Sequence, residues 1–338
     1  MLLPHVWIAA LARNNLLNKL MDINASKYFW QHVDWENPQF KLSRSFYSKL
    51  KFDEEIIIPL SIHGDGAPYT EVDSLKVVSM RSTLSSTSIK MSQFLLFAAA
   101  NASLAEKSLD MVWKTLVWSF KSLAEGVHPS NDAYDVAYSE MPFRTEEQET
   151  RFRLAGKPLG GDTIVRGIIL VLSGDIEWFC QQFKWPYAMS NFPCPFCKCD
   201  NLRAGSKVPF TDFSQEAKWR GTLLNPSELQ ENYGKHWMMQ VPGVNAMTIK
   251  MDTLHMLDLG VAAHVYGNLI WSILEDQLKG ARAAKLDQLN AQIGDIYEQL
   301  GISAQQRIRR LHLSDINKSR SEEHTSELQS HSDLVCRL

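Results

Sequence analysis

Two long apolar runs are the clearest feature of the hydrophobic pattern. They are residues 55–60 (Glu-Ile-Ile-Ile-Pro-Leu) and residues 164–172 (Ile-Val-Arg-Gly-Ile-Ile-Leu-Val-Leu). Short apolar runs bounded by turn-forming residues are typical of buried strands. The first run leads into Gly64-Asp65-Gly66 and the second into Ser173-Gly174-Asp175. Because glycine and aspartate favour turns, the pattern predicts that both strands end in tight turns there.

The rest of the chain alternates between strand and helix patterns. Short apolar runs predict further strands at residues 76–80 and 94–100. Helical spacing predicts an N-terminal amphipathic helix that continues to about Met21, and further helices over the ranges 104–124, 253–278 and 283–300. This order of elements predicts an α/β fold. We expect a helical segment over 1–54, a core over 55–185, a cysteine-containing insertion over 186–250 and C-terminal helices over 251–318.

The last residues have a different character. Residues 320–331 (Arg-Ser-Glu-Glu-His-Thr-Ser-Glu-Leu-Gln-Ser-His) match the translation of a common short-read sequencing adapter. They show no hydrophobic period that could pack against a core. We therefore expect residues 319–338 to be an adapter-derived artefact that is disordered and dispensable, so that Cys336 carries no function. The natural C-terminal part would then be missing beyond about Ser319.

Composition narrows the class of protein. The chain is 45% hydrophobic and contains 10 Trp, which is typical of a globular protein rather than a disordered one. The net charge of −3 gives no basic field over the whole molecule, so nucleic acid would need a local patch. No apolar run is long enough to span a membrane, and the apolar N-terminus lacks the basic start of a signal peptide. The 5 Cys do not form a secreted disulfide framework, so we expect a nuclear or otherwise intracellular protein.

Asp65 and Asp175 are the first candidates for chemistry. Each follows a strongly apolar strand, and strand ends in open α/β sheets are where sites are built. Two carboxylates on neighbouring strands could share a pair of Mg²⁺ (or Mn²⁺) ions, which stabilise the attacking and leaving oxygens of a phosphoryl displacement. The alternative is that both aspartates only form turns.

A cysteine pair is the second candidate. Cys194-Pro195-Phe196-Cys197 is a C-x₂-C knuckle, which supplies half of a zinc site. His255 is the best third ligand, and the fourth is left open between Asp252, His264 and Cys199. The alternative is a pair of buried thiols in a reduced protein, with a histidine on a helix face.

The order of these motifs resembles the catalytic core of CACTA-like DDE/D transposases and, more distantly, the Transib and V(D)J-recombinase group. Residues 58–69 (Ile-Pro-Leu-Ser-Ile-His-Gly-Asp-Gly-Ala-Pro-Tyr) are similar to the family's first-aspartate strand. Asp175, followed at the family's spacing by Cys194-Pro195-Phe196-Cys197, is similar to its second-aspartate block. Asp252-Thr253-Leu254-His255 matches the [C/D]-x₂-H element that follows.

The resemblance implies a ribonuclease-H-like mixed sheet with flanking helices and a zinc-knuckle insertion. It implies metal-dependent hydrolysis and transfer of DNA phosphodiesters, with DNA, in the form of transposon ends, as the partner. A homo-oligomer is compatible with it, and no small-molecule cofactor is expected. The family's third acid is a glutamate on a later helix; Glu275 is the one candidate in range, and the alternative is that the true residue lay beyond Ser319. A catalytically inactive or domesticated copy that acts as a binding module is the other reading.

Overall fold

A computed structural model describes residues 1–312 of the chain, apart from 69, 71–72, 106, 188, 203–204, 213, 253–262, 305–306 and 309. The chain divides into two compact units, Met1–Lys250 and Met251–Leu338, which are described separately. The adapter-like residues 319–338 lie outside the described residues. None of the helices in the described part is both long and apolar enough to cross a membrane.

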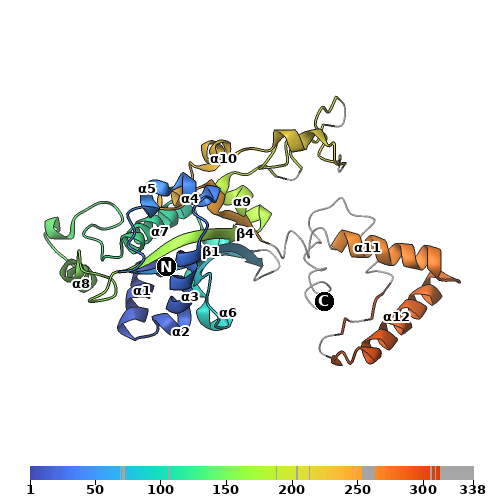
Figure 1. The fold of residues 1–338 in the computed structure, drawn as a ribbon, viewed down its shortest axis with the longest axis horizontal. Coiled ribbons are helices and arrows are strands. Elements are labelled where there is room, and N and C mark those ends of the chain that lie inside the picture. The colour runs from blue at the N-terminus through green and yellow to red at the C-terminus, as the bar shows by residue number, and fades with distance from the viewer. Residues whose placement is uncertain are drawn as a thin grey trace. The chain divides into compact units, whose positions relative to one another are not determined.

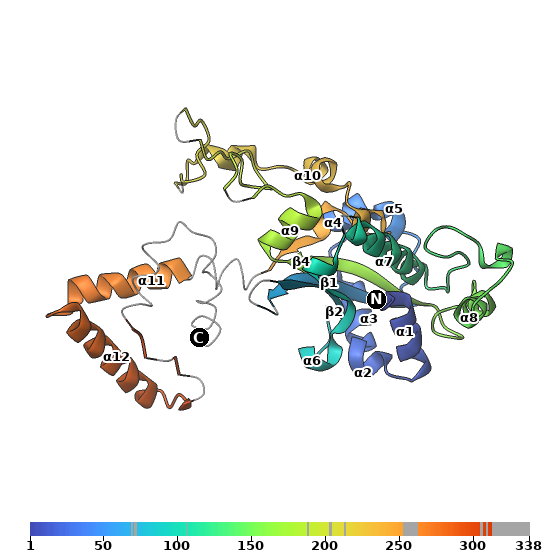
Figure 2. The same ribbon diagram turned by 180° about the vertical axis from the view of Figure 1, so that it is seen from behind.

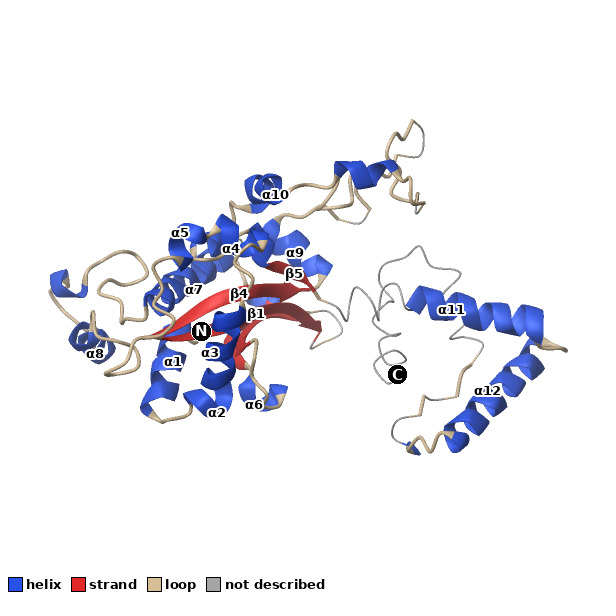
Figure 3. Ribbon diagram, in the orientation of Figure 1, coloured by secondary structure: helices blue, strands red, loops and turns tan. Residues whose placement is uncertain are grey.

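The first unit is built around one mixed sheet (Figures 1 and 3). Its five strands lie in the order β3-β2-β1-β4-β5. The central strand β1 pairs with β2 in antiparallel and with β4 in parallel orientation, and β2 pairs with β3 in antiparallel orientation. The strands are β1 (Ile56–Pro68), β2 (Ser74–Ser82), β3 (Phe94–Ala100), β4 (Val165–Gly174) and β5 (Ile249–Met251).

The predicted strands are confirmed, but one predicted turn is wrong. β1 does not end at Gly64–Gly66; it continues to Pro68, because these residues pair with Lys76–Val78 of β2. The neighbouring strand supplies the backbone hydrogen bonds that a turn would otherwise have closed locally. Asp65 therefore lies within a strand and not in a turn. Asp175 does follow the end of β4 and begins a helix.

Helices surround the sheet (Figures 1 and 2). α1 packs against α7, and α7 packs against β4, whereas α3 packs against β1. The bounds of the helices, with α8 and α10 in the peripheral loops, are α1 (Pro4–Arg13), α2 (Leu17–Met21), α3 (Ile23–His32), α4 (Pro38–Leu42), α5 (Arg44–Tyr47), α6 (Ile89–Ser92), α7 (Ser108–Glu125), α8 (Glu146–Leu154), α9 (Ile176–Phe183) and α10 (Pro226–Tyr233).

The ends of two helices show how sequence sets their length. The N-terminal helix was expected to run to about Met21, but it breaks after Arg13, where Asn15 takes a left-handed conformation with φ of 54°. Asparagine tolerates that conformation better than most residues. α7 ends as predicted at Gly126, whose φ of 74° is the usual glycine cap.

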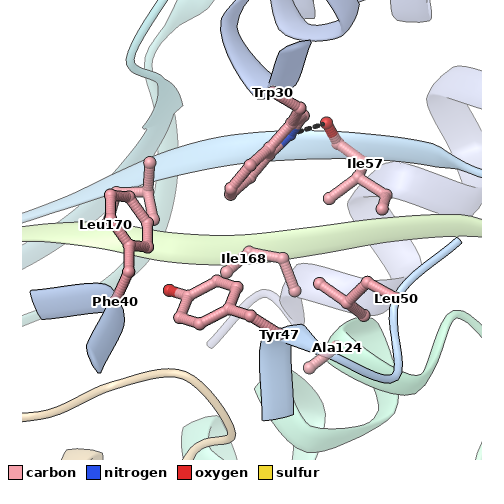
Figure 4. Close-up of a cluster of buried hydrophobic side chains, with 8 residues drawn as sticks. All are labelled: Trp30, Phe40, Tyr47, Leu50, Ile57, Ala124, Ile168 and Leu170. Atoms are coloured by element: carbon pink, nitrogen blue, oxygen red, sulfur yellow. Dashed lines mark hydrogen bonds between the residues drawn. The ribbon is translucent and has the colours of Figure 1, made fainter. Parts of the chain in front are cut away.

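An aromatic cluster packs the N-terminal segment onto strands β1 and β4 (Figure 4). Trp30 is 4% exposed, and its indole Nε1 donates a hydrogen bond of 2.8 Å to the carbonyl of Ile57. The remaining buried members are Phe40, Tyr47, Leu50, Ile57, Ala124, Ile168 and Leu170. Residues 1–54 therefore form part of the core of the first unit rather than a separate appendage.

A buried ion pair joins the start of β1 to β4. Arg166 donates from Nε and Nη2 to the two carboxylate oxygens of Glu55, at 2.6 and 2.8 Å, and from Nη1 to the carbonyl of Ala124 at 2.8 Å. The side chains of Arg166 and Glu55 are only 17% and 6% exposed. This two-bond geometry is the strongest form of the arginine–carboxylate contact.

Replacing Glu55 by glutamine is expected to lower the free energy of unfolding by about 3–5 kcal/mol, because it leaves the buried guanidinium of Arg166 without a counter-charge. Urea denaturation of the purified chain measures this. Glu54→Gln is the matched control, since its ion pair with Lys51 is exposed and is worth at most about 1 kcal/mol. Equal effects of the two variants would contradict the importance of the buried pair.

The described residues of the second unit form helices α11 and α12. α11 (Ala263–Ser272) continues into a π-helical turn (Ile273–Gln277), and α12 (Arg282–Gln299) follows. Of the long helix predicted from Thr253, residues 253–262 lie outside the described residues. The predicted helix over 283–300 is confirmed as α12. A small apolar cluster of Leu274, Leu286, Leu289 and Leu311 holds this unit together.

Candidate functional site

The sheet brings the two candidate aspartates to adjacent strands. In the parallel pairing of β1 and β4, Gly64 lies opposite Gly174. Asp65 and Asp175 each come one residue later. Both side chains are partly exposed. Residues far apart in the sequence thus meet at one end of the sheet.

A side-chain contact indicates which face these residues use. His63 lies opposite Ser173, and the His63 Nδ1 is 3.2 Å from the Ser173 hydroxyl. The two side chains therefore project from the same face. Because side chains alternate along a strand, Asp65 projects from that face of β1, two residues beyond His63. Asp175 follows the end of β4 and caps α9, so its side chain is positioned by the helix and not by this alternation.

The opposite face is occupied by Trp178 of α9. A Cβ built on Gly64 would lie 2.0 Å from the indole of Trp178, and one built on Gly174 would lie 2.7 Å from it. Real atoms do not approach so closely, so glycine at both positions lets the indole lie directly on the two strands. Trp178 also packs edge-on against Trp113 of α7, with ring centroids 6.2 Å apart. This packing fixes the strand ends that carry the aspartates.

Each aspartate already accepts one local hydrogen bond. Asp175 is the N-cap of α9, and its Oδ1 accepts from the backbone N–H of Trp178 at 2.5 Å. Asp65 Oδ1 accepts from the backbone N–H of Gly66 at 2.7 Å. A carboxylate has about four lone-pair positions, so each group retains acceptor capacity for a cation.

Glu275, the candidate third acid, belongs to the second unit. It lies in the π-helical turn and pairs with Arg282 at 3.2 Å and with Lys285 at 3.8 Å. These ion pairs are a sufficient structural reason for a glutamate at this position.

Three cysteines form a compact cluster in the loop after α9. The Sγ atoms of Cys194, Cys197 and Cys199 all lie within 4.8 Å of one another. In a tetrahedral zinc site, Zn–S bonds of 2.3 Å place sulfur atoms about 3.8 Å apart. The three thiols therefore fit a metal ion such as zinc after a small contraction. Cys199, at first only one of three alternatives for the fourth ligand, belongs to the same group as the C-x₂-C pair.

The loop around the cluster is held by backbone and side-chain contacts. The Cys194 sulfur accepts a hydrogen bond from the backbone N–H of Phe196 at 3.3 Å. Phe196 packs edge-on against Trp185, with ring centroids 5.2 Å apart. The phenol of Tyr233 in α10 donates to the carbonyl of Pro195 at 2.9 Å. These contacts hold the loop that carries the thiols.

Burial and crowding make the free thiolates unfavourable. Burial raises the pKa of the Cys194 thiol, and burial together with the neighbouring Cys197 raises the pKa of Cys199 to about 12. Without a positive ion the thiols of Cys194 and Cys199 therefore keep their protons at neutral pH. A bound metal would supply the missing charge and displace those protons.

Among the described residues, none of the other predicted zinc ligands belongs to the cysteine cluster. Asp252 lies in the second unit, directly after β5, and has a partner of its own. His255 lies outside the described residues. His264 lies in α11, but its side chain is not described. The cluster therefore has three ligands within the described part of the chain, and its fourth stays a prediction.

Sequence reasoning did not identify Ser173 as the partner of His63 or Trp178 as the packing group behind the aspartates. Neither residue belongs to a recognisable motif. The pattern does contain one clue, because a glycine precedes each aspartate. Comparisons with family models, curated proteins and solved structures return no match for this chain.

Proposed function

We propose that the first unit is a ribonuclease-H-like catalytic core of the DDE/D transposase type, which hydrolyses and transfers DNA phosphodiesters with the help of divalent metal ions. The observation that carries the proposal is the registration of β1 with β4, which aligns Asp65 and Asp175 beside the His63–Ser173 contact. The strand order β3-β2-β1-β4-β5, with β4 parallel to β1, supports it. This arrangement is the one expected of such a core.

In this proposal Asp65 and Asp175 hold Mg²⁺ or Mn²⁺ through the carboxylate oxygens left free by their local hydrogen bonds. The ions, when bound, stabilise the attacking and leaving oxygens of the phosphoryl displacement. The Asp175 cap and the Trp178 packing keep the two carboxylates at fixed positions on the strand ends. Glu275, or a residue beyond Ser319, would complete the acidic set. The partner would be transposon-end DNA, and the chain would act in the nucleus or elsewhere inside the cell.

The cysteine cluster would serve a structural role in this proposal. Zinc held by Cys194, Cys197 and Cys199 would fix the loop-rich insertion between α9 and β5, which has few buried apolar residues of its own. A fourth ligand from Asp252, His255 or His264 would also tie the insertion to the long C-terminal helices. No chemistry at the acidic site needs the zinc.

Nicking of supercoiled plasmid DNA in the presence of Mn²⁺ tests the proposal. Asp65→Asn and Asp175→Asn are each expected to reduce the nicking rate at least about 100-fold, because the charge that holds the ions is lost. Both are also expected to weaken binding of Mn²⁺ itself, followed by electron paramagnetic resonance. Asp53→Asn, at an exposed position before β1, is the control and should change neither. Wild-type chain that binds no Mn²⁺ at the acidic site would contradict the proposal.

A second candidate is a catalytically inactive copy that acts as a binding module. It is favoured by the local hydrogen bonds of both aspartates and by the ion pairs of Glu275, since each acid then has a structural role. The same experiment separates the two functions. Mn²⁺ binding without nicking would support the binding module, whereas nicking that depends on both aspartates would exclude it.

A further inference from the structure

A hollow lined by aromatic rings lies on the first unit, well away from the aspartates. It has a volume of about 340 Å³ and is lined by Trp35, Phe40, Arg44, Tyr47, Ser48, Leu50 and Phe52. It sits on the aromatic cluster that packs near Ile57 of β1 (Figure 4). Ile57 and Asp65 are eight residues apart on one strand, or roughly 26 Å. The hollow is therefore separate from the acidic site.

The floor and the walls of the hollow differ in exposure. Phe40, Tyr47 and Leu50 form a floor that is 3–9% exposed. Trp35 forms a wall, 39% exposed, with its ring 5.3 Å from that of Phe52 and 5.5 Å from that of Phe40. Buried aromatic floors with partly open walls resemble the pockets that receive an anchoring side chain at protein interfaces.

Arg44 gives the hollow its charge. Its side chain is exposed, and it makes no ion pair or hydrogen bond with any residue that the structure describes. The contact with Lys41 lowers the pKa of Glu36, and the nearby charge of Arg44 lowers it further, but the carboxylate pairs with Lys41, at 2.7 Å. Lys51 pairs with Glu54 at 3.0 Å. The guanidinium is thus available to a ligand carboxylate, for which its planar shape is suited.

We propose that this hollow, the aromatic pocket, binds a segment of a partner protein in which a bulky apolar side chain stands next to an aspartate or glutamate. The apolar side chain would lie on the buried floor, and the carboxylate would pair with Arg44. A free small molecule fits less well, because the open walls would leave much of its surface in water, whereas drug-sized ligands are usually 70–90% buried. Nucleic acid fits less well because Arg44 is the one charged side chain among the lining residues, so the hollow offers phosphates no continuous basic surface.

Titration of full-length chain labelled with 5-fluorotryptophan tests the proposal. The probe is the peptide acetyl-Gly-Trp-Glu-Glu-Gly-amide, and the readout is the fluorine resonance of Trp35, assigned from its loss in Trp35→Phe. We expect this resonance to shift and to saturate below about 1 mM peptide. Peptides with Ala for Trp, or with Lys-Lys for Glu-Glu, should bind at least tenfold more weakly.

Arg44→Gln is expected to raise the dissociation constant for the peptide about tenfold, whereas Lys49→Gln, an exposed cation of the same segment outside the lining, should leave it unchanged. Arg44 is exposed and makes no contact that folding would need, so the variant should fold normally. The proposal is overturned if the peptide causes no shift, if Arg44→Gln binds it as tightly as wild type, or if a 12-nucleotide single-stranded DNA or free indole-3-acetate shifts Trp35 at a lower concentration than the peptide. The result does not depend on the DNA-processing proposal, because no residue of the acidic site is involved.

Discussion

Replacing Cys197 by serine is expected to abolish zinc binding and to unfold the loop that surrounds the cluster. Cys197 is 8% exposed and stands between Cys194 and Cys199 in the sequence. Its sulfur lies within 4.8 Å of the sulfurs of both. Structural zinc in small sites contributes apparent binding free energies of about 10–16 kcal/mol, so its loss should be the largest stability effect in this chain. We expect about one equivalent of zinc per wild-type chain and none in the variant, measured by elemental analysis.

Cys180→Ser is the matched control for this experiment. Cys180 is also buried, but its sulfur contacts the carbonyl of Pro186 at 3.3 Å and belongs to no cluster among the described residues. The variant should keep its zinc. Limited proteolysis should cut the insertion rapidly in Cys197→Ser and slowly in Cys180→Ser. Purified wild-type chain with no zinc and three freely reactive thiols would contradict the site.

Substitution of cobalt for zinc identifies the fourth ligand. Cobalt substituted for zinc absorbs visible light with an intensity that reports four-coordinate geometry. Replacing Asp252, His255 or His264 in turn by alanine should alter the cobalt spectrum for the true ligand alone. An unchanged spectrum in all three variants would mean that water or another residue completes the site.

Acid is expected to destabilise the first unit in a pH range set by two histidines, the buried His5 and the partly buried His236. Burial, with smaller contributions from His128 and Arg151, lowers the pKa of His5 from 6.5 to about 3. Burial, with a smaller contribution from Lys184, lowers the pKa of His236 to about 4. Both groups stay neutral in the folded chain at pH values where the unfolded chain binds a proton.

The neutral form of His5 has a hydrogen-bond partner in the core. The backbone N–H of His5 donates to the Ser119 hydroxyl at 3.2 Å, and the same hydroxyl is 2.7 Å from His5 Nδ1. The hydroxyl can therefore donate its proton to a neutral Nδ1 while it accepts from the backbone N–H. His236 is held similarly, because its Nδ1 accepts from the backbone N–H of Met238 at 3.1 Å.

The sign of the pH effect follows from these pKa values. The stability due to each neutral histidine is fully present above about pH 6.5, and it is lost as the pH falls from there towards the folded-state pKa. The expected slope is up to about 1.4 kcal/mol per pH unit for each histidine. Urea denaturation at several pH values between 7 and 4 measures it.

Two substitutions test whether His5 is a titrating group. Both are compared by the slope of unfolding free energy against pH, not by stability at one pH. His5→Gln should reduce the dependence on pH in this window, even if it lowers stability at every pH. His32→Gln is the control, since His32 lies on an exposed face of α3, stacked on Tyr28, and its loss should leave the slope unchanged. An identical slope in wild type and His5→Gln would rule out His5 as the titrating group.

The local sequence pattern determined much of the secondary structure of this protein, because each buried segment has apolar residues at the spacing of its own strand or helix. The apolar runs before Asp65 and Asp175 predicted β1 and β4, and helical spacing before Gly126 predicted α7 with its cap. The C-x₂-C pair likewise indicated a metal-binding loop by itself, because two of its ligands are neighbours in the chain. These features depend only on residues a few positions apart.

Tertiary structure decided everything that depends on distant pairing. Gly64–Gly66 looks like a turn in isolation, but hydrogen bonds to β2 keep it in the strand, so Asp65 projects from a sheet. The parallel register of β1 with β4 then aligns His63 with Ser173 and Gly64 with Gly174, and the indole of Trp178 can lie on the two glycines because neither carries a side chain. No local pattern records a register between strands separated by a hundred residues, because the choice among registers is made by the packing of both faces at once.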